Sequence, residues 1–198
     1  MSSEASSLRP ERWEAVLDFW FGPRDQRGTA RPEWFRKDPK FDDEIRARFG
    51  ATHRAAAAGE LEAWRASPQP MVALVVVLDQ FSRNLHRGDA RAFAQDAHAR
   101  DCARQALARG DDRVVLPVER QFLYMPFEHS EDLADQDRCH GLMAGLEAFA
   151  ETRGLSEWAE KHRVIIRRFG RFPHRNAALG RVSTPAEREF LAQRGSGF

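Results

Sequence analysis

The chain has 198 residues, of which 42% are hydrophobic and 31% are charged, so it can bury a core and is too apolar to be disordered. Its formal net charge of +1 lacks the basic excess typical of nucleic-acid and membrane-surface proteins, which argues against both classes of partner. The two cysteines, Cys102 and Cys139, fall in no metal-binding spacing, so we expect reduced thiols and no metal or other cofactor.

The N-terminus carries no targeting signal, because it is polar and serine-rich and no apolar stretch follows it. The most apolar run, residues 71–78, is far shorter than the roughly 20 residues of a membrane helix. We therefore expect a cytoplasmic protein without a membrane partner. Residues 1–9 are predicted to be a disordered segment, and residues 10–194 a single domain.

Apolar residues recur at helical spacing from the first third of the chain onward. The pattern predicts a first helix over residues 10–20. Asp38 followed by Pro39 predicts an N-cap and the first position of a second helix, which runs to Ala58. A short helical segment over 61–66 precedes a proline-rich break.

The next helix is predicted to be the centre of the domain. An unbroken helical stripe consists of Met71, Leu74, Leu78, Phe81 and Leu85, and valines cover its other sides. A buried strand is the alternative for this valine-rich run, but no nearby segment offers a partner strand. The polar residues of the helix are confined to residues 79–84.

Helical signals continue to the C-terminus. A helix from Asp89 to about Ala108 is followed by one that opens at Pro117 and is ended or kinked at Pro126, because the residue before a proline avoids the α region. Ser130 is predicted to cap the following helix, with Glu131 and Asp132 in its first turn. The last two helices are predicted to begin at Ser156 and at the capping box of residues 184–187.

These signals amount to eight or nine helices and no convincing strand. The loops are short, which favours antiparallel packing of sequential helices. The sequence therefore predicts an all-α, single-domain protein.

Polar residues gather first at the end of the central helix. Asp79 and Arg83 are one helical turn apart, so their side chains can pair. Two interpretations stay open: an internal salt bridge between helices, or a pocket in which Asp79, Arg83 and Asn84 contact a ligand.

A second polar segment surrounds His129, just ahead of a predicted helix N-terminus, where free N–H groups favour anions. In one interpretation His129 is a general acid/base oriented by Glu131 or Glu128. In the other, Ser130 is only a cap and His129 packs on Phe127.

A third segment is locally basic, because residues 161–186 contain no Asp or Glu. Arginine forks hold carboxylate or phosphate well, so the segment predicts an anion site. Its candidate ligand-binding residues are His162, Arg171, His174, Arg175 and Asn176. A solvated helix face followed by a rigid turn is the alternative. The histidines show no zinc spacing, so no metal site is predicted.

These segments resemble an uncharacterised bacterial family catalogued as domain of unknown function 924. The matching strings are LDQFSRN at 78–84, MPFEHSED at 125–132 and RFGRFPHRNAALGR at 168–181, with further likeness at 16–22, 31–38 and 183–191. The resemblance implies a helical array of the tetratricopeptide (TPR-like) type. It implies no activity, substrate or catalytic residue.

The function is left open between two main hypotheses. The first is an enzyme for a small anionic substrate, with His129 as acid/base, Glu131 as its orienter, and Arg171 and Arg175 as an anion clamp. The second is a binding module for an acidic peptide or protein partner, because TPR-like arrays commonly bind peptides on a concave face. This module would use Arg83, Arg171 and Arg175.

Two further hypotheses have less support. Nucleic-acid binding through residues 161–181 conflicts with the near-zero net charge and the absence of a recognised motif. A purely structural role would make the polar segments an internal network.

Overall fold

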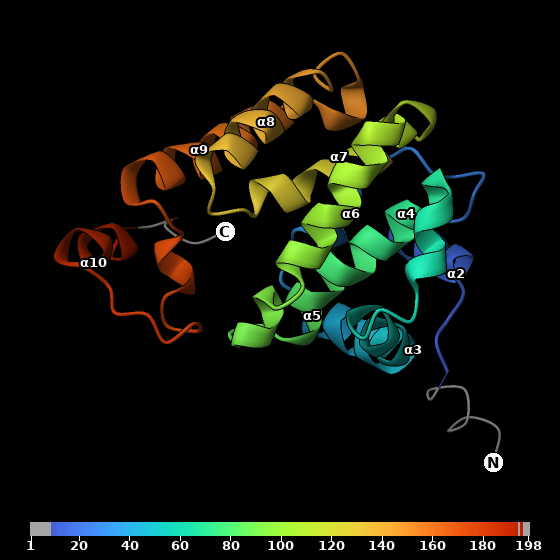
Figure 1. Ribbon diagram of the computed structural model, residues 1–198, viewed down its shortest axis with the longest axis horizontal. Helices are drawn as coiled ribbons and strands as arrows, with labels where there is room; N and C mark the ends of the chain where they lie inside the picture. The colour runs from blue at the N-terminus through green and yellow to red at the C-terminus, as the bar shows by residue number, and fades with distance from the viewer. Residues whose placement is uncertain (1–8, 194, 196–198) are drawn as a thin grey trace.

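The computed structural model describes residues 9–193 and 195, and within them every regular element is a helix (Figure 1). The α-helices are α2 (Trp13–Phe21), α3 (Pro39–Ala57), α4 (Pro68–Val75), α5 (Ser82–Leu85), α6 (Asp96–Arg109), α7 (Pro117–Glu128), α8 (Leu133–Ala144), α9 (Leu155–Phe169) and α10 (Pro185–Leu191). Short 3-10 turns are η1 (Pro32–Trp34), η2 (Glu62–Ala66), η4 (Ala90–Phe93), η5 (Asp111–Val114), η6 (Ala150–Thr152) and η7 (Pro173–Arg175). The all-α prediction is confirmed.

Two limits of the described chain bear on the predictions. Apart from Arg9, the predicted disordered segment 1–9 lies outside the described residues. Among the helices that are described, none combines the length and the apolar character needed to cross a membrane.

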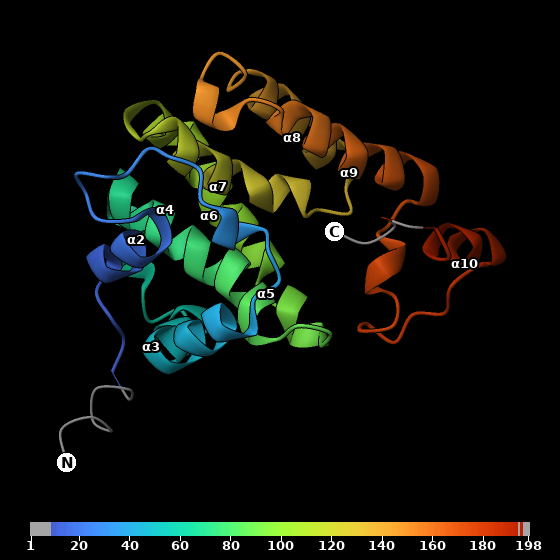
Figure 2. The ribbon, with the colours of Figure 1, turned by 180° about the vertical axis from the view of Figure 1, so that it is seen from behind.

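The helices form a central body with an extension at its C-terminal side. Helix α4 contacts α2, α6 and α7, and α3 lies against the segment that continues α4. Helices α7, α8 and α9 follow one another as packed neighbours, with α8 and α9 side by side (Figures 1 and 2). Helix α10 and η7 lie beyond the end of α9, so the basic segment comes back toward the central body.

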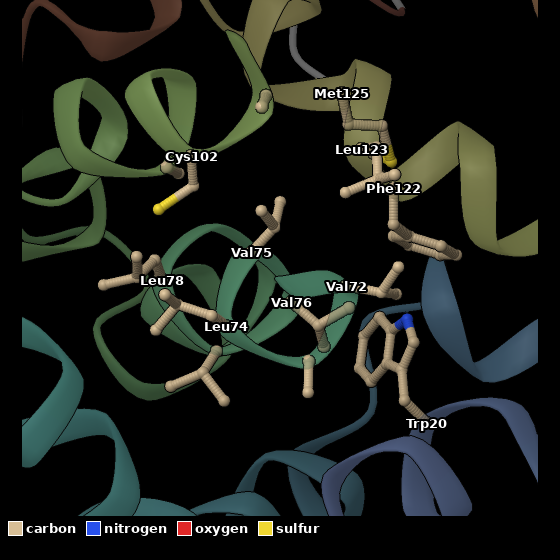
Figure 3. Packing of buried hydrophobic residues seen from close by; sticks show 14 of the residues in the cluster. Trp20, Val72, Leu74, Val75, Val76, Leu78, Cys102, Phe122, Leu123 and Met125 are labelled. Atoms are coloured by element: carbon tan, nitrogen blue, oxygen red, sulfur yellow. The ribbon is translucent and has the colours of Figure 1, made fainter. Parts of the chain in front are cut away.

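The core is built around α4, as the hydrophobic stripe predicts. Its residues Val72, Leu74 and Val75 have no exposed surface. Figure 3 shows Val72 beside Trp20 of α2 and Phe122 of α7, with Leu74 and Val75 on other sides of the helix. Fully burying a side chain of this size stabilises the fold by about 1.5–3 kcal/mol. The core therefore fixes the direction of α4 and of the residues that follow it.

The segment directly after α4 is a π-helix, η3 (Val76–Phe81). All six of its residues are buried, and Asp79 is one of them. The helix continues into α5, so the predicted helix from 71 to 85 is continuous, although its hydrogen-bond pattern changes. A π-turn holds an extra residue and is frequently found at functional sites. Because the π-turn holds one extra residue, Asp79 occupies a different position around the helix axis from the one it would have in a regular α-helix.

Near His129, one predicted helix start is wrong, and of the two alternatives for Pro126 the ending of the helix is wrong. Pro126 lies inside α7, which continues to Glu128. The proline falls in the last turn, where it costs one backbone hydrogen bond that the surrounding buried contacts offset. Asp132, not Ser130, caps α8 and accepts hydrogen bonds from the backbone N–H groups of Ala134 (2.7 Å) and Asp135 (3.4 Å). Ser130 instead donates to the Asp135 carboxylate at 2.8 Å.

Other predicted caps are confirmed. Asp38 accepts hydrogen bonds from backbone N–H groups in the first turn of α3, and Thr184 and Glu187 form the capping box of α10. Gly170 ends α9 in the left-handed region at φ 69°, where a side chain would be strained. This turn directs the chain from α9 into η7.

Candidate functional site

A buried carboxylate and an imidazole form the centre of the candidate site. Asp79 Oδ1 of η3 lies 2.7 Å from Nδ1 of His129, the residue that caps the C-terminus of α7. The Asp79 side chain is 1% exposed and that of His129 is 14% exposed. Gln80 Nε2 donates to the second carboxylate oxygen at 2.6 Å.

The Asp79 carboxyl is ionised at neutral pH. Burial raises its pKa, but the neighbouring His129 and Arg83 outweigh burial and lower the pKa to about 2. A carboxylate can only accept, so His129 carries a proton on Nδ1. Its Nε2 is then the atom that can take or give a proton.

Two arginines share one carboxylate beside this pair. Arg83 Nη1 lies 2.7 Å from Asp96 Oδ1, and Arg175 Nη1 lies 3.1 Å from Asp96 Oδ2. Arg83 Nη2 is also 3.7 Å from Asp79 Oδ1, which connects the arginines to the Asp79–His129 pair. We call these five residues, from η3, α5, α6, α7 and η7, the central cluster: Asp79, Arg83, Asp96, His129 and Arg175.

The two guanidinium groups of the central cluster are not fully hydrogen-bonded. Arg83 Nη2 and Arg175 Nε are buried, and neither has a hydrogen-bond partner in the part of the chain that the structure describes. Arg175 is only 6% exposed. Burial, followed by the neighbouring Arg83 charge, lowers its pKa to about 10. Buried N–H donors normally have acceptors, so the arrangement suits one further oxyanion.

Aromatic rings hold the two guanidinium groups in place. Arg83 lies 4.9 Å and Arg175 4.6 Å from the centre of the Phe93 ring, and Arg175 lies at the same 4.6 Å from Phe172. Such stacking favours cations and restricts their orientation.

Two further histidines border the central cluster. His162 of α9 lies with its ring centre 6.5 Å from that of His129, and its Nδ1 is 2.8 Å from Glu128 Oε1. The Phe172 ring contacts His162 and His174, with centres 5.8 and 5.5 Å away. Burial, followed by the Arg175 charge, lowers the pKa of His174 to about 4, so it is neutral at pH 7.

Two predicted ligand-binding residues point elsewhere. Asn84 donates to Asp42 Oδ1 of α3 at 2.7 Å and so ties α5 to α3. Asn176 donates to Ser183 Oγ at 3.0 Å and accepts from Arg181 Nε at 2.9 Å, so it holds the loop before α10. Both amides are occupied by hydrogen bonds within the protein.

Glu131 does not orient His129, contrary to the prediction. It accepts two hydrogen bonds from the Arg181 guanidinium, at 2.7 and 2.9 Å, and one from the Phe172 N–H at 2.7 Å. Asp79, 50 residues before His129, takes the orienting position instead. Glu131 is close to His129 in sequence, but α8 starts only at Leu133, so Glu131 lies in the connecting loop and faces residues 172–181.

Arg171 is not part of the predicted anion clamp. Its guanidinium donates to both oxygens of Glu187, at 2.6 and 2.8 Å, and to the Val182 carbonyl oxygen at 2.9 Å. This pairing fixes the end of α9 to the start of α10. We call the residues that hold this part of the chain together the loop cluster: Glu131, Arg171, Asn176, Arg181 and Glu187.

Asp96 is the residue of the site that the sequence did not reveal. It is the first residue of α6, where an acidic side chain is expected simply because it suits the helix dipole. Asp96 joins the central cluster only because the folded chain brings it into contact with Arg83 and with Arg175, which is 79 residues away. Within the described residues, no three His, Cys, Asp or Glu side chains are grouped so that they could hold a metal ion.

Comparisons with known proteins agree on one family. Among curated proteins no relative matches the chain. The structure of a protein of unknown function from Agrobacterium tumefaciens, ATU0120, is similar with a TM-score of 0.80 and 41% sequence identity, over 91% of this chain and 96% of that chain. The family model described as "Bacterial protein of unknown function (DUF924)" matches residues 16–195. The chain therefore belongs to the DUF924 family of bacterial proteins.

Proposed function

We propose that this protein is an enzyme that acts on a small anionic substrate by general acid/base catalysis at the central cluster. The observation that carries the proposal is the 2.7 Å contact between His129 Nδ1 and the buried carboxylate of Asp79, beside two arginines with incomplete hydrogen bonding. An imidazole held by a buried carboxylate, next to a site for negative charge, is typical of proton-transfer catalysis.

In this mechanism each residue has a separate task. Asp79 keeps the His129 proton on Nδ1 and stabilises the imidazolium that forms when Nε2 takes a proton from the substrate. Arg83 and Arg175 bind the anionic group of the substrate, so that the reacting atom lies within reach of His129. Their shared positive charge also stabilises negative charge that develops in the transition state.

The charge balance of the cluster supports an anionic substrate. Asp79 and Asp96 provide two negative charges, whereas Arg83 and Arg175 provide two positive ones. When His129 is protonated, the cluster carries one excess positive charge in a largely buried place. A bound carboxylate or phosphate would offset that charge and accept from the buried N–H groups. The alternative of an acidic-peptide groove used Arg83, Arg171 and Arg175, and of these the Arg171 guanidinium is already bound to Glu187.

The first experiment is a thermal-shift screen of purified protein against phosphates, nucleotides, carboxylates and acidic peptides. A ligand at 100 times its dissociation constant adds about 2.7 kcal/mol of stability, which is easily measured. We expect a small anion to stabilise the wild type but not Arg83→Gln or Arg175→Gln. Arg12→Gln, which removes an exposed arginine from a surface ion pair, is the matched control and should respond as the wild type does.

Catalysis is tested on the anions that bind. Conversion of each is followed by NMR with wild-type protein and with His129→Gln. The proposal expects His129→Gln to retain the thermal shift and to lose turnover. If no small anion stabilises the protein, or if turnover is unchanged in His129→Gln, the proposed function is wrong; stabilisation by acidic peptides alone would favour the binding-module hypothesis.

A further inference from the structure

A second carboxylate–imidazole pair lies next to the first. Glu128 Oε1 is 2.8 Å from His162 Nδ1, and the two side chains are 7% and 10% exposed. The ring centres of His162 and His129 are 6.5 Å apart. Because Glu128 and His129 are adjacent at the end of α7, one helix end supplies the carboxylate of one pair and the imidazole of the other.

The surroundings of His162 fix its tautomer. Two acceptors face Nδ1, namely Glu128 Oε1 at 2.8 Å and the Trp158 carbonyl oxygen at 2.9 Å. Nδ1 must therefore carry the proton, and Nε2 is the basic nitrogen of the neutral ring. The same argument holds for His129, whose Nδ1 faces the Asp79 carboxylate. Two neighbouring imidazoles are thus prepared to exchange protons through Nε2.

A structural role alone does not account for this arrangement well. A single contact would be enough to hold α7 against α9. A buried pair of ionisable side chains also stabilises the folded state no more than packed apolar side chains of similar volume do. The core between these helices already contains apolar residues, including Phe127 and Ala159. Two pairs with the same tautomer, beside arginines with unused donors, point to chemistry.

We propose that His162, held by Glu128, is a second catalytic residue, and that the enzyme transfers two protons, one through His129 and one through His162. This inference rests on the proposed function and narrows its substrate class. Rings 6.5 Å apart can contact two atoms of one small molecule whose anionic group is bound by Arg83 and Arg175.

The two imidazoles suit a reaction that removes one proton from the substrate and adds another. In the productive state one imidazole is neutral and the other is protonated. The neutral ring takes a proton from a carbon next to a carbonyl group, and the C–H electron pair forms the new C=C bond. The carbonyl π pair moves onto oxygen, which accepts the proton of the second ring. The enzyme ends with the two protonation states exchanged, and proton exchange with water restores them before the next turnover. Enolisation of a small oxo acid is a reaction of this kind.

The test follows the imidazole nitrogens of the intact protein by long-range 1H–15N NMR with 15N-labelled histidine. Signals are assigned by replacing one histidine at a time with Gln. Inorganic phosphate and, separately, oxalate are added to the wild type at constant pH. We expect the Nε2 signals of His129 and His162 to shift together with one dissociation constant. His98, which pairs with Glu62 outside the site, is the internal control and should not shift.

The outcomes separate the two proposals. A shift at His129 without one at His162 overturns the second catalytic residue and leaves the proposed function intact. No shift at either ring with either anion overturns both. In Glu128→Gln the Trp158 carbonyl oxygen still accepts from Nδ1, so we expect the tautomer to be kept and the His162 nitrogen signals to shift because the charged acceptor is lost, while those of His129 stay as they are. An unchanged His162 pattern in that variant would contradict the role of Glu128. The titration itself uses the wild type, so it does not depend on the folding of any variant in the site.

Discussion

The central cluster and the loop cluster are both built from arginines and carboxylates, yet they differ in how completely their donors are satisfied. In the loop cluster, Glu131 accepts three hydrogen bonds, and Arg171 binds both oxygens of Glu187. In the central cluster, Arg83 and Arg175 share one carboxylate, and each keeps a buried nitrogen that has no hydrogen bond to any of the residues that the structure describes. The first arrangement is complete as it stands, whereas the second has capacity for another acceptor.

The difference shows that the partners around an arginine, and not the number of arginines in a segment, decide whether its hydrogen-bond donors are all used within the protein. Arg171, Arg175 and Arg181 lie within eleven residues of one another in the same basic segment. Two of them hold the loop, and only Arg175 turns into the central cluster.

The largest expected effect separates the two clusters by stability. Asp79→Ala leaves Arg83 and His129 without their buried carboxylate and should lower the free energy of unfolding by about 3–5 kcal/mol. Glu131→Ala removes a more exposed partner and should cost about 1–2 kcal/mol. Urea unfolding of both variants measures the difference. Equal losses would mean that Asp79 is no more critical to the fold than a loop carboxylate.

The next effect is the loss of folding stability at acidic pH. The folded-state pKa of His174 is lowered from 6.5 to about 4, so the unfolded chain binds the proton more readily between these values. Above pH 6.5 His174 is neutral in both the folded and the unfolded chain, so it does not lower the free energy of unfolding. As the pH falls from 6.5 toward 4, only the unfolded chain takes up the proton, and the free energy of unfolding decreases by at most about 3 kcal/mol. His53, buried on α3, has the same shift. Unfolding at pH 7 and pH 5 should therefore show a smaller difference in His174→Gln than in the wild type; an identical difference would contradict the neutral state of His174.

A smaller effect is expected from Arg181→Ala. It removes the two hydrogen bonds to Glu131 and should cost about 1–2 kcal/mol, because the pair is partly exposed. Anion-induced stabilisation should persist in this variant, since the loop cluster binds no ligand in our proposal. Thermal shift with and without phosphate measures both quantities. Loss of the phosphate effect would show that the two clusters act as one unit.

The smallest effect tests a single cap. Thr184→Ala removes the side-chain acceptor for the Glu187 N–H and should cost about 1 kcal/mol. Thr184→Ser keeps that acceptor and is the matched control, with an expected change close to zero. Urea unfolding of the two variants decides whether the capping box matters to the loop cluster.

The sequence predicted those features that depend on local patterns. The stripe from Met71 to Leu85 revealed the buried central helix, and Asp38 and Thr184 revealed helix starts, because spacing and capping act over a few residues. It also singled out Asp79, Arg83, His129 and Arg175. It did not predict the π-turn, which leaves no periodic pattern, or Asp96, which looks like an ordinary first-turn acid. Glu131 was assigned to His129 by proximity in sequence, whereas tertiary contacts gave that position to Asp79.

The long separations inside the central cluster bear on how the protein is made. Asp79 meets His129 across 50 residues, and Asp96 meets Arg175 across 79. A nascent chain can therefore form α2 to α6 around its apolar core well before Arg175 leaves the ribosome. Contacts between distant residues also form late in refolding, because closing a long loop costs chain entropy. The central cluster is thus completed last, after the compact shape of the chain.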